Sequence, residues 1–417
     1  MSTFIIKGGR PLKGEIAVAG MKNAATPILA AALLTQETCV IRNVPRILDV
    51  ARMLEIIQSL GAEASWTGDH EITITAKRVG FNNFNPHLVC RLRSSVLLIG
   101  PLLARLGSFE LPEPGGCQIG NRPLDTHWSV LQQFGAVVTR QNGSYKVLAE
   151  KLKAAHLILP EISVTATENA VMAAVLTKGT TVVEMAAAEP HVQDLCNFLN
   201  NLGAKIRGVG THTLEIDGVV ELHGGTYTII PDQIEAGTWA VLAAVTKSTL
   251  KITGVRADHL SLVLYKLREA SVSYTLSQET LEIHPSALKA FKVQTMPYPG
   301  FPTDLQAPFG VLATQAVGTS LIHDPLFEGR FGYVQELIKM GATAIQADPH
   351  RVIITGPTPL FAQEIKSLDL RAGVTLIIAA LVAEGETRIQ DAEVVDRGYE
   401  DIVPRLQAIG AEIQREE

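Results

Sequence analysis

The sequence predicts an α/β protein of two domains, each built from three copies of one unit of about 70 residues. Three observations predict this fold class: the length of 417 residues, an apolar composition, and an internal repeat. One hydrophobic core rarely extends over so long a chain, so the chain is expected to divide. Hydrophobic residues make up 47% and charged residues 19%, which is typical of a packed globular protein and excludes a disordered chain.

The repeat is recognised by a Gly-Ala pair that follows an amphipathic stretch and precedes two alternating segments. A single pair of this kind is a common helix end, but near-constant spacing over six copies indicates a repeat. Each glycine is expected to end a helix in the left-handed conformation, which costs glycine nothing sterically. The six positions, with serine replacing glycine in the fourth, are Gly61, Gly135, Gly203, Ser271, Gly341 and Gly410.

Each element of the unit follows from a local pattern. The stretch before the pair, such as "VARMLEIIQSL" at residues 50–60, has apolar residues at helical spacing and predicts a helix. Turn residues such as Gln-Asn-Gly separate two alternating segments and predict a hairpin after the helix. Runs such as "GTTVVE" and "GETRIQD" predict further strands. Six units most simply divide three and three near residue 229, and a ligand is expected in a cleft between the two domains.

Composition and motifs exclude several classes of protein. The net charge of −6 argues against a generic nucleic-acid binder, which needs a basic face. No apolar run approaches the ~20 residues that a bilayer requires, and the N-terminal segment has no signal-peptide pattern. The GxG of residues 208–210 lies in a predicted hairpin turn, so a dinucleotide site is rejected. The spacing of cysteines and histidines matches no metal-binding motif, so we expect no bound metal and no cofactor. The absence of paired-cysteine motifs is also typical of a reduced, cytoplasmic protein.

Cys117 is the candidate reactive thiol. It lies in "LPEPGGCQIGNRPLD", residues 111–125, between glycines and shortly before Arg122. No helical or strand period surrounds it, and a nearby cation favours the thiolate. Most intracellular cysteines simply pack, and that is our expectation for Cys39, Cys90 and Cys196, which lie in helix or strand patterns.

Other residues are candidates for binding an anion or moving a proton. Lys22 and Asn23 begin a predicted helix, where backbone N–H groups attract anions. Asp304 precedes a helix-like segment and is either a helix N-cap or a general base, which the local pattern leaves open. Several arginines begin apolar helices, where they either form surface ion pairs or converge on a polyanion. They are Arg93, Arg330, Arg371 (with Asp369 beside it) and Arg397.

Seven segments resemble one family in their order along the chain: "GMKNAATPILAAALL", "RSSVLLIGPLLARLG", "GGCQIGNRPLDTH", "FPTDLQAPF", "FEGRF", "DLRAG" and "DRGYE". From end to end the chain is similar to the UDP-N-acetylglucosamine 1-carboxyvinyltransferases, the enolpyruvyl transferases that begin peptidoglycan precursor synthesis. The resemblance implies a two-domain inside-out α/β barrel with its active site in the interdomain cleft. It also implies one domain of residues 21–229, which carries Cys117, and a second domain of residues 1–20 and 230–417.

The resemblance further implies transfer of the enolpyruvyl group of phosphoenolpyruvate, a co-substrate, to the 3′-hydroxyl of UDP-N-acetylglucosamine, with release of phosphate. Such an addition and elimination needs an acid and a base. By similarity Cys117 is the acid and forms a covalent adduct with phosphoenolpyruvate, and Asp304 is the base, with Asn23 nearby. Lys22, Arg122 and Arg397 are implied to hold the phosphate, and Arg93, Asp369 and Arg371 to complete the site. Implied nucleotide and sugar contacts are Arg122, Pro123, Leu124, Asp125, Ser163, Thr165, Asp304 and Leu326.

The chain departs from the family pattern at Glu161, Thr165 and Gln233, where a basic residue, a glycine and an arginine are expected. These positions concern nucleotide contacts. Two alternatives stand beside the assignment. The 5-enolpyruvylshikimate-3-phosphate synthases have the same fold and donor but lack the "GGC" loop. A silent UDP-sugar-binding paralogue has no reason to keep all four of Lys22, Cys117, Asp304 and Arg397. The expected partners are the two small substrates, with neither nucleic acid nor membrane, and a monomer is favoured.

Overall fold

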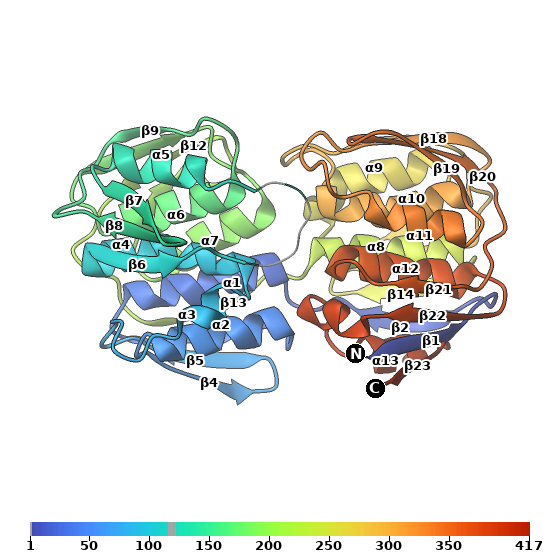
Figure 1. The fold of residues 1–417 in the computed structure, drawn as a ribbon, viewed down its shortest axis with the longest axis horizontal. Coiled ribbons are helices and arrows are strands. Elements are labelled where there is room, and N and C mark those ends of the chain that lie inside the picture. The colour runs from blue at the N-terminus through green and yellow to red at the C-terminus, as the bar shows by residue number, and fades with distance from the viewer. Residues whose placement is uncertain (1, 116–119, 121) are drawn as a thin grey trace. The chain divides into compact units, whose positions relative to one another are not determined.

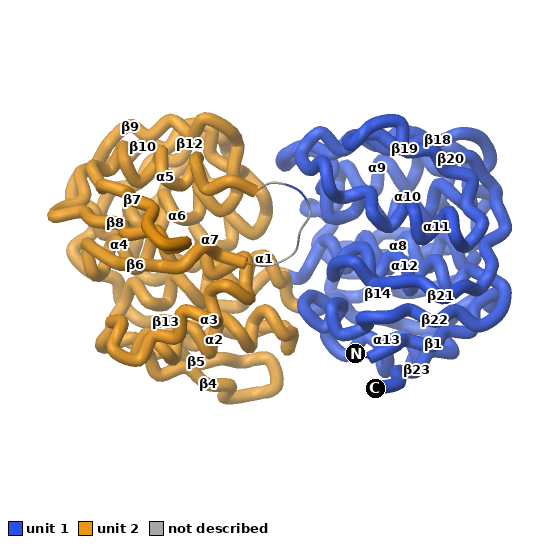
Figure 2. Tube along the Cα trace, in the orientation of Figure 1, with its two compact units in different colours: residues 1–19, 118–121, 231–417 blue, residues 20–117, 122–230 orange. Residues whose placement is uncertain are grey.

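The structure is a computed structural model that describes residues 2–115, 120 and 122–417. Its chain forms two compact units, shown in Figures 1 and 2. Among the described residues, unit 1 comprises residues 2–19, 120 and 231–417, and unit 2 comprises residues 20–115 and 122–230. The chain passes from unit 1 to unit 2 at residues 19–20 and returns at residues 230–231. The sequence placed these changes after residue 20 and after residue 229.

One repeat consists of a strand, a helix and a hairpin, followed by a buried helix. In unit 2, β3 (Thr38–Arg42) leads to α2 (Leu48–Ser59) and then to the hairpin β4 (Glu63–Gly68) and β5 (Glu71–Thr75). Strand β5 lies between β4 and β3 and is antiparallel to both. Strand β13 (Gly225–Thr228) joins the other side of β3 in parallel. The sheet order is therefore β13-β3-β5-β4.

The other sheets follow this order, and among the described residues each unit has three sheets. In unit 2 the remaining elements are β6 (Ser108–Pro112), α5 (Asp125–Gln133), β7 (Val137–Gln141) and β8 (Ser144–Leu148), then β9 (His156–Ile158), β10 (Thr180–Glu184), α7 (Pro190–Asn201), β11 (Lys205–Arg207) and β12 (Thr213–Asp217). The sheet β6-β8-β7 has three strands within the described chain, and the short α3 (Pro86–Val89) lies against β6.

Unit 1 repeats the plan and is completed by the N-terminal strand. Its elements are β2 (Lys13–Ala17), β14 (Thr249–Thr253), α9 (Ser261–Glu269), β15 (Ser273–Leu276) and β16 (Thr280–His284); β17 (Lys292–Gln294), β18 (Gly318–His323), α11 (Gly332–Lys339), β19 (Thr343–Asp348) and β20 (Arg351–Gly356); and β21 (Glu364–Lys366), β22 (Glu386–Gln390), α13 (Ile402–Ala408), β23 (Glu412–Glu416) and β1 (Thr3–Lys7). In the last repeat β1 pairs with both β22 and β23, and so takes the place of the second hairpin strand.

A second set of helices forms the interior of the units. Its members are α1 (Lys22–Ala31), α4 (Ile99–Leu106), α6 (Val164–Ala174), α8 (Gln233–Val245), α10 (Gln306–Thr314) and α12 (Leu370–Val382). Every residue of α8 and α10 is buried, and most of them are apolar, as expected for interior helices. In unit 1, α8, α10 and α12 pack against one another, and each also contacts strands of a surrounding sheet. Short 3₁₀ helices are η1 (Ala32–Leu34), η2 (Arg93–Leu98), η3 (Ala257–Leu260), η4 (Thr303–Leu305) and η5 (Ala392–Arg397).

The predicted inside-out α/β fold class is confirmed, because helices fill the interior and sheets of three or four strands cover it among the described residues. The predicted helix ends are also confirmed. The five glycines of the repeat have φ between +90° and +102°, and Ser271 has φ +62°. The left-handed conformation thus recurs even where the chain has a side chain at this position.

Candidate active site

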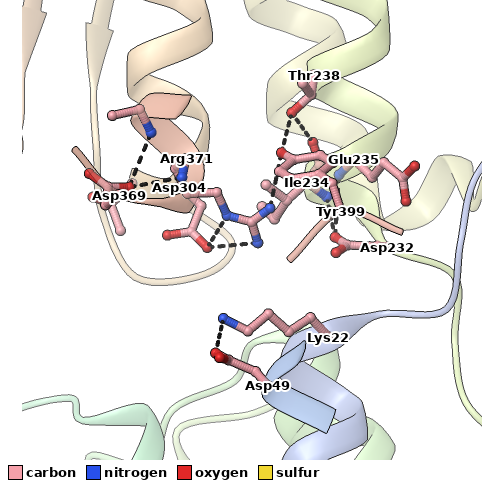
Figure 3. A network of polar contacts seen from close by, with 12 residues as sticks. Lys22, Asp49, Asp232, Ile234, Glu235, Thr238, Asp304, Asp369, Arg371 and Tyr399 are labelled. Carbon is pink, nitrogen blue, oxygen red and sulfur yellow. Dashed lines mark hydrogen bonds and ion pairs between the residues drawn. The ribbon is translucent and has the colours of Figure 1, made fainter. Parts of the chain in front are cut away.

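Lys22 is the first residue of α1 in unit 2, as predicted. Its ammonium lies 2.9 Å from the Oδ2 atom of Asp49, which belongs to the first turn of α2 (Figure 3). The Asp49 side chain is 3% exposed and that of Lys22 13% exposed. Arg52, one turn further along α2, has its Nη1 atom 4.0 Å from Asp49 Oδ1. A carboxylate this deeply buried needs a cationic partner, so the pair fixes the direction of the Lys22 side chain.

Arg93 and Arg122 are linked in unit 2. Arg93 begins η2, and its Nη2 atom donates a 2.5 Å hydrogen bond to the carbonyl oxygen of Arg122. Burial lowers the pKa of Arg93, against the opposing effect of Glu113 and Tyr145. An arginine remains charged under these conditions because its ordinary pKa is so high. Arg93 thereby holds the backbone that leads through Pro123 and Leu124 into α5.

The first turn of α5 is hydrogen-bonded to the segment that begins α6. Thr126 donates from Oγ1 to the Glu161 carboxylate at 2.9 Å, and His127 Nε2 lies 2.9 Å from Thr165 Oγ1. Burial first, and then the charges of Arg93 and Arg122, lower the pKa of His127 to about 3. The imidazole is therefore neutral near pH 7.

The two segments assigned to nucleotide contacts by resemblance are thus joined to each other. Asp125 is the exposed first residue of α5, and Ser163 is the N-cap residue of α6. Glu161 and Thr165, two of the three positions that depart from the family pattern, make the joining hydrogen bonds. The third, Gln233, is the buried first residue of α8, and its Oε1 atom has no hydrogen-bond partner among the described residues.

Asp304 lies in η4 of unit 1, between two guanidinium groups. Arg330 Nη2 is 2.8 Å from Asp304 Oδ1, and the Nε and Nη2 atoms of Arg371 are both 3.2 Å from Oδ2. The N-cap residues of η4 and α10 are Pro302 and Leu305, so the structure excludes the helix-cap interpretation of Asp304. Its carboxylate is held by side chains that come from elsewhere in the unit.

Arg371, the second residue of α12, is fixed by an aromatic hydroxyl and by Asp304 (Figure 3). Its Nη1 atom donates to Tyr399 Oη at 3.1 Å, and its guanidinium carbon lies 5.5 Å from the centre of the Tyr399 ring. The Tyr399 hydroxyl is also 3.2 Å from Thr238 Oγ1. Burial acts to lower the pKa of Arg371, but Tyr399, Asp304 and Asp232 raise it above the ordinary value.

Two further aspartates cap helices around Arg371. Asp369 accepts hydrogen bonds from the backbone N–H of Arg371 at 2.8 Å and of Ala372 at 3.1 Å, and so begins α12. Asp232 caps α8 in the same way. Burial raises the pKa of Asp232 to about 6, although the Arg371 charge acts to lower it. Asp232 thus caps the N-terminal end of α8, and Asp369 caps that of α12, from which Arg371 projects.

A pocket in unit 1 brings part of the predicted site together. Asp304, Asp369 and Arg371 line it, as does Arg330, with Thr303, Gln306, Ala307 and Ala372 completing the wall. Arg397 is the last residue of η5, and Leu326 follows β18 with 39% of its surface exposed. Neither of them is among the described residues that line this pocket. Asn23 follows Lys22 on α1 of unit 2 and is half-buried.

The cysteines fall into three classes. Cys117 lies outside the described residues. Cys39 and Cys196 are buried as predicted, and burial raises the pKa of their thiols to about 11 and about 12. The prediction that Cys90 packs inside is wrong, because this residue is exposed at the end of the four-residue helix α3, whose Val89 is buried instead. In the described part of the chain no three His, Cys, Asp or Glu side chains form a group that could hold a metal.

Sequence reasoning missed Asp49 and Tyr399. Asp49 was detectable as an acidic residue at the start of the helix that follows Lys22 in the chain. Tyr399 belongs to "DRGYE", a segment already selected for Arg397. Its burial, at 2% exposure, is what makes it a partner for Arg371, and burial of a single tyrosine has no local sequence signal.

Comparison with known proteins places the chain in a family. The model of the EPSP synthase (3-phosphoshikimate 1-carboxyvinyltransferase) family matches residues 6–406. The UDP-N-acetylglucosamine 1-carboxyvinyltransferase of Koribacter versatilis is 42% identical over 100% of this chain and 96% of its own length. The enzyme of the same name from Psychromonas ingrahamii is 44% identical over 100% of this chain and 99% of its own. The chain belongs to the UDP-N-acetylglucosamine 1-carboxyvinyltransferase family. The predicted family and the predicted class of enzyme, a transferase, are thereby confirmed.

Solved structures agree with this carboxyvinyltransferase fold. The enolpyruvyl transferase NikO from Streptomyces tendae has a TM-score of 0.90 and is 27% identical, over 100% of this chain and 99% of that one. The EPSP synthase from Acinetobacter baumannii has a TM-score of 0.75 at 20% identity over the full length of both chains, which shows the fold alone. The transferase has no helix among its described residues that is long and apolar enough to cross a membrane.

Proposed function

We propose that this chain transfers the enolpyruvyl group of phosphoenolpyruvate to the 3′-hydroxyl of UDP-N-acetylglucosamine and releases phosphate, the first committed step of peptidoglycan precursor synthesis. The observation that carries the proposal is 42–44% identity, over essentially the whole chain, to relatives named for this reaction. The sister reaction on a shikimate acceptor is disfavoured, because the solved EPSP synthases are only 19–20% identical.

The proposed reaction is an addition followed by an elimination. Asp304 accepts the proton of the sugar hydroxyl as its oxygen bonds to C2 of phosphoenolpyruvate, while Cys117 delivers a proton to C3. A tetrahedral intermediate with a methyl group results. The Cys117 thiolate then takes one proton back from that methyl group, while cleavage of the bond from C2 to the phosphate oxygen restores the double bond and releases phosphate. Alternatively, the Cys117 S–H adds across the double bond of phosphoenolpyruvate, with the sulfur bonding to C2 and the proton going to C3, and forms the covalent adduct.

Cationic side chains bind the anionic donor in this proposal. Lys22, Arg122 and Arg397 bind the phosphate, because ammonium and guanidinium groups stabilise the negative charge that accumulates as it leaves. Arg93, Asp369 and Arg371 complete the site, and Asn23 assists near the acceptor. Nucleotide and sugar contacts come from residues 122–125, Ser163, Thr165, Asp304 and Leu326. Acid, base and cations are all side chains, so we propose that the reaction needs neither metal nor organic cofactor. We further propose that the protein is a cytoplasmic monomer.

Phosphate release from phosphoenolpyruvate, measured with and without UDP-N-acetylglucosamine, tests the reaction. Release is expected only with the sugar nucleotide and not with shikimate 3-phosphate. Folded protein that binds the nucleotide but releases no phosphate would establish the silent-paralogue alternative instead.

Covalent labelling tests the thiol. The electrophilic epoxide fosfomycin is expected to add once to the wild-type chain in the presence of UDP-N-acetylglucosamine, as read by intact mass. Cys117→Asp is expected to stay unlabelled, and Cys90→Ser, which removes the exposed cysteine, is the matched control that retains labelling. If Cys90→Ser lost the adduct and Cys117→Asp kept it, the reactive thiol would be Cys90 and not Cys117.

A further inference from the structure

Asp324 is a fully buried residue of unit 1 that has no part in the proposed reaction. It follows β18, and its backbone N–H donates to the carbonyl oxygen of His350 at 2.8 Å. The carbonyl oxygen of Asp324 lies 2.8 Å from His350 Nδ1, which carries the proton because a carbonyl can only accept. His350 belongs to the turn between β19 and β20, so two hydrogen bonds attach the Asp324 backbone to that hairpin.

The repeat shows that the fold does not require a carboxylate at this position. In all six repeats the N–H of the corresponding residue donates to the carbonyl oxygen of the residue just before the second hairpin strand, or before β1, which replaces it. The six donors are Val44, Glu113, Ala186, Val255, Asp324 and Ala392. Four of them are buried Val or Ala, Glu113 is exposed, and only Asp324 buries a carboxylate. Because a buried carboxylate is costly unless it is hydrogen-bonded, its presence here needs a local reason.

Three donors surround the Asp324 carboxylate. Its Oδ1 atom accepts from Thr295 Oγ1 at 2.8 Å and from the Leu326 N–H at 3.0 Å, and its Oδ2 atom accepts from Thr303 Oγ1 at 2.5 Å. The bond to Leu326, two residues further along the chain, closes an Asx turn. One carboxylate thus joins the residue that follows β17, the turn after β18 and the first residue of η4.

The segment from Thr295 to Thr303 connects β17 with η4, and both of its ends bond to Asp324. Its middle is held by other contacts. The Met296 N–H donates to the Phe301 carbonyl oxygen at 3.0 Å, and the buried Phe301 ring lies 4.8 Å from the ring of Phe309 in α10. We therefore expect the segment to stay packed when the carboxylate is replaced, and only the position of η4 to change.

We infer that Asp324 is a positioning residue for the acceptor sugar, and that it sets the distance between η4 and the backbone at Leu326. The inference rests on the proposed function, in which η4 carries the base Asp304 and Leu326 contacts the sugar. UDP offers the nucleotide contacts of UDP-N-acetylglucosamine without the sugar. Asp324 is therefore expected to affect the binding of the sugar nucleotide and not that of UDP.

Titration calorimetry with UDP-N-acetylglucosamine and with UDP tests the inference without turnover. Asp324→Asn keeps the shape of the side chain but presents an amide NH₂ to at least one donor, so that hydrogen bond is lost. We expect the Kd for UDP-N-acetylglucosamine to rise about tenfold and kcat to fall about tenfold, because the sugar is then misplaced. The Kd for UDP and the KM for phosphoenolpyruvate are expected to change little. Equal weakening of both ligands, or no weakening of either in the folded variant, overturns the inference.

Two threonines on the same carboxylate provide a matched pair. Thr303→Val removes the donor in η4, and Thr295→Val removes a fully buried donor that is not among the described residues lining the pocket. Both variants are expected to lower the urea midpoint by similar amounts. Only Thr303→Val is expected to weaken binding of the sugar nucleotide, and Thr303→Ser, which retains the hydroxyl, is expected to restore it. Equal weakening in both valine variants contradicts the positioning role.

The variants divide the possible failures between the inference and the proposed function. Thr303 Oγ1 also accepts from Arg330 Nη1, so Asp324→Asn, which leaves Thr303 in place, is the primary test. If Asp324→Asn does not fold, the two valine variants decide. Wild-type protein that binds the sugar nucleotide but releases no phosphate overturns the proposed reaction, whereas the ratio of the two Kd values still tests Asp324. A normal wild-type rate with an unchanged ratio in Asp324→Asn overturns only the inference.

Discussion

In unit 2 the ammonium of Lys22 is held by the carboxylate of Asp49, whereas in unit 1 the carboxylate of Asp304 is held by the guanidinium groups of Arg330 and Arg371. The charges of the two pairs are reversed, but in both pairs one side chain is clearly more buried than the other. The Asp49 side chain is 3% exposed against 13% for Lys22, and that of Arg371 is 7% exposed against 18% for Asp304. In each unit the better-buried side chain, Asp49 or Arg371, holds the more accessible one, Lys22 or Asp304.

The repeat places both arrangements at the same kind of position. Several site residues stand at or just before the N-terminal ends of the buried helices: Lys22 at α1, Arg93 before α4, Ser163 and Thr165 at α6, Asp304 before α10, and Asp369 and Arg371 at α12. The N-terminal end of a helix carries partial positive charge, which favours anions. The same backbone plan therefore presents a lysine ammonium in unit 2 and an aspartate carboxylate in unit 1, and only the side chains differ.

Lys22 and Asp49 allow the largest expected effect to be measured. Lys22→Met is expected to lower kcat/KM for phosphoenolpyruvate by about 100-fold, as removal of one charge-stabilising donor does. Asp49→Asn is expected to cost about tenfold, because the ammonium then lacks the group that orients it. Initial rates against phosphoenolpyruvate concentration give both values.

A double substitution shows whether Asp49 acts through Lys22. In the Lys22→Met background, Asp49→Asn is expected to cost nothing further, since the group that it orients is gone. An equal cost in both backgrounds would contradict the arrangement described for unit 2. Lys7→Met removes an exposed lysine of unit 1 that pairs with Glu386 at 3.7 Å, and activity close to wild type is expected.

His127 predicts a pH dependence of stability. Its pKa is about 3 in the folded chain, against an ordinary value of 6.5, so below pH 6.5 the unfolded chain takes up a proton that the folded chain does not. Stability is therefore lost as pH falls, by about 2 kcal/mol between pH 6.5 and pH 5. His127→Gln removes this contribution. Urea unfolding at the two pH values is expected to show a smaller loss in the variant, and identical losses would mean that His127 is protonated in the folded chain.

Tyr399 tests the unit 1 arrangement from the buried side. Tyr399→Phe keeps the ring beside Arg371 but leaves the Nη1 atom without the hydroxyl, which is expected to lower the free energy of unfolding by about 1–2 kcal/mol. Tyr227→Phe is the matched variant in unit 2, where the hydroxyl donates to Asp194 Oδ1 at 2.6 Å. Urea unfolding is expected to give similar losses, but only Tyr399→Phe is expected to lower kcat. Equal effects of Tyr399→Phe and Tyr227→Phe on kcat would show that Tyr399 does not help to position Asp304.

The fold could be predicted from the internal repeat. The site could be predicted only in part, because its side chains contact residues that are distant in the sequence. Helical spacing, turn residues and the six helix ends are local patterns, so they locate the elements and the position of Lys22 directly. The partners of Asp304 lie far along the chain, and no local pattern connects Arg330 or Arg371 to it. The resemblance to the family implied a place in the site for Arg371 but none for Arg330. Burial decided the rest: Cys90 lies in a helix pattern like Cys196, yet only Cys196 is inside.

Ser271 provides the smallest and most local comparison between the units. It has φ +62°, where the other five repeats have glycine, and a side chain in this conformation costs about 1 kcal/mol. Ser271→Gly is therefore expected to raise the free energy of unfolding by about 1 kcal/mol, as measured by urea denaturation. Gly135→Ser in unit 2 is the reverse substitution at φ +90°, where an added Cβ meets no atom within 4 Å. It is expected to cost a similar amount through the backbone alone. A loss in Gly135→Ser without a gain in Ser271→Gly would mean that the serine side chain offsets its own strain.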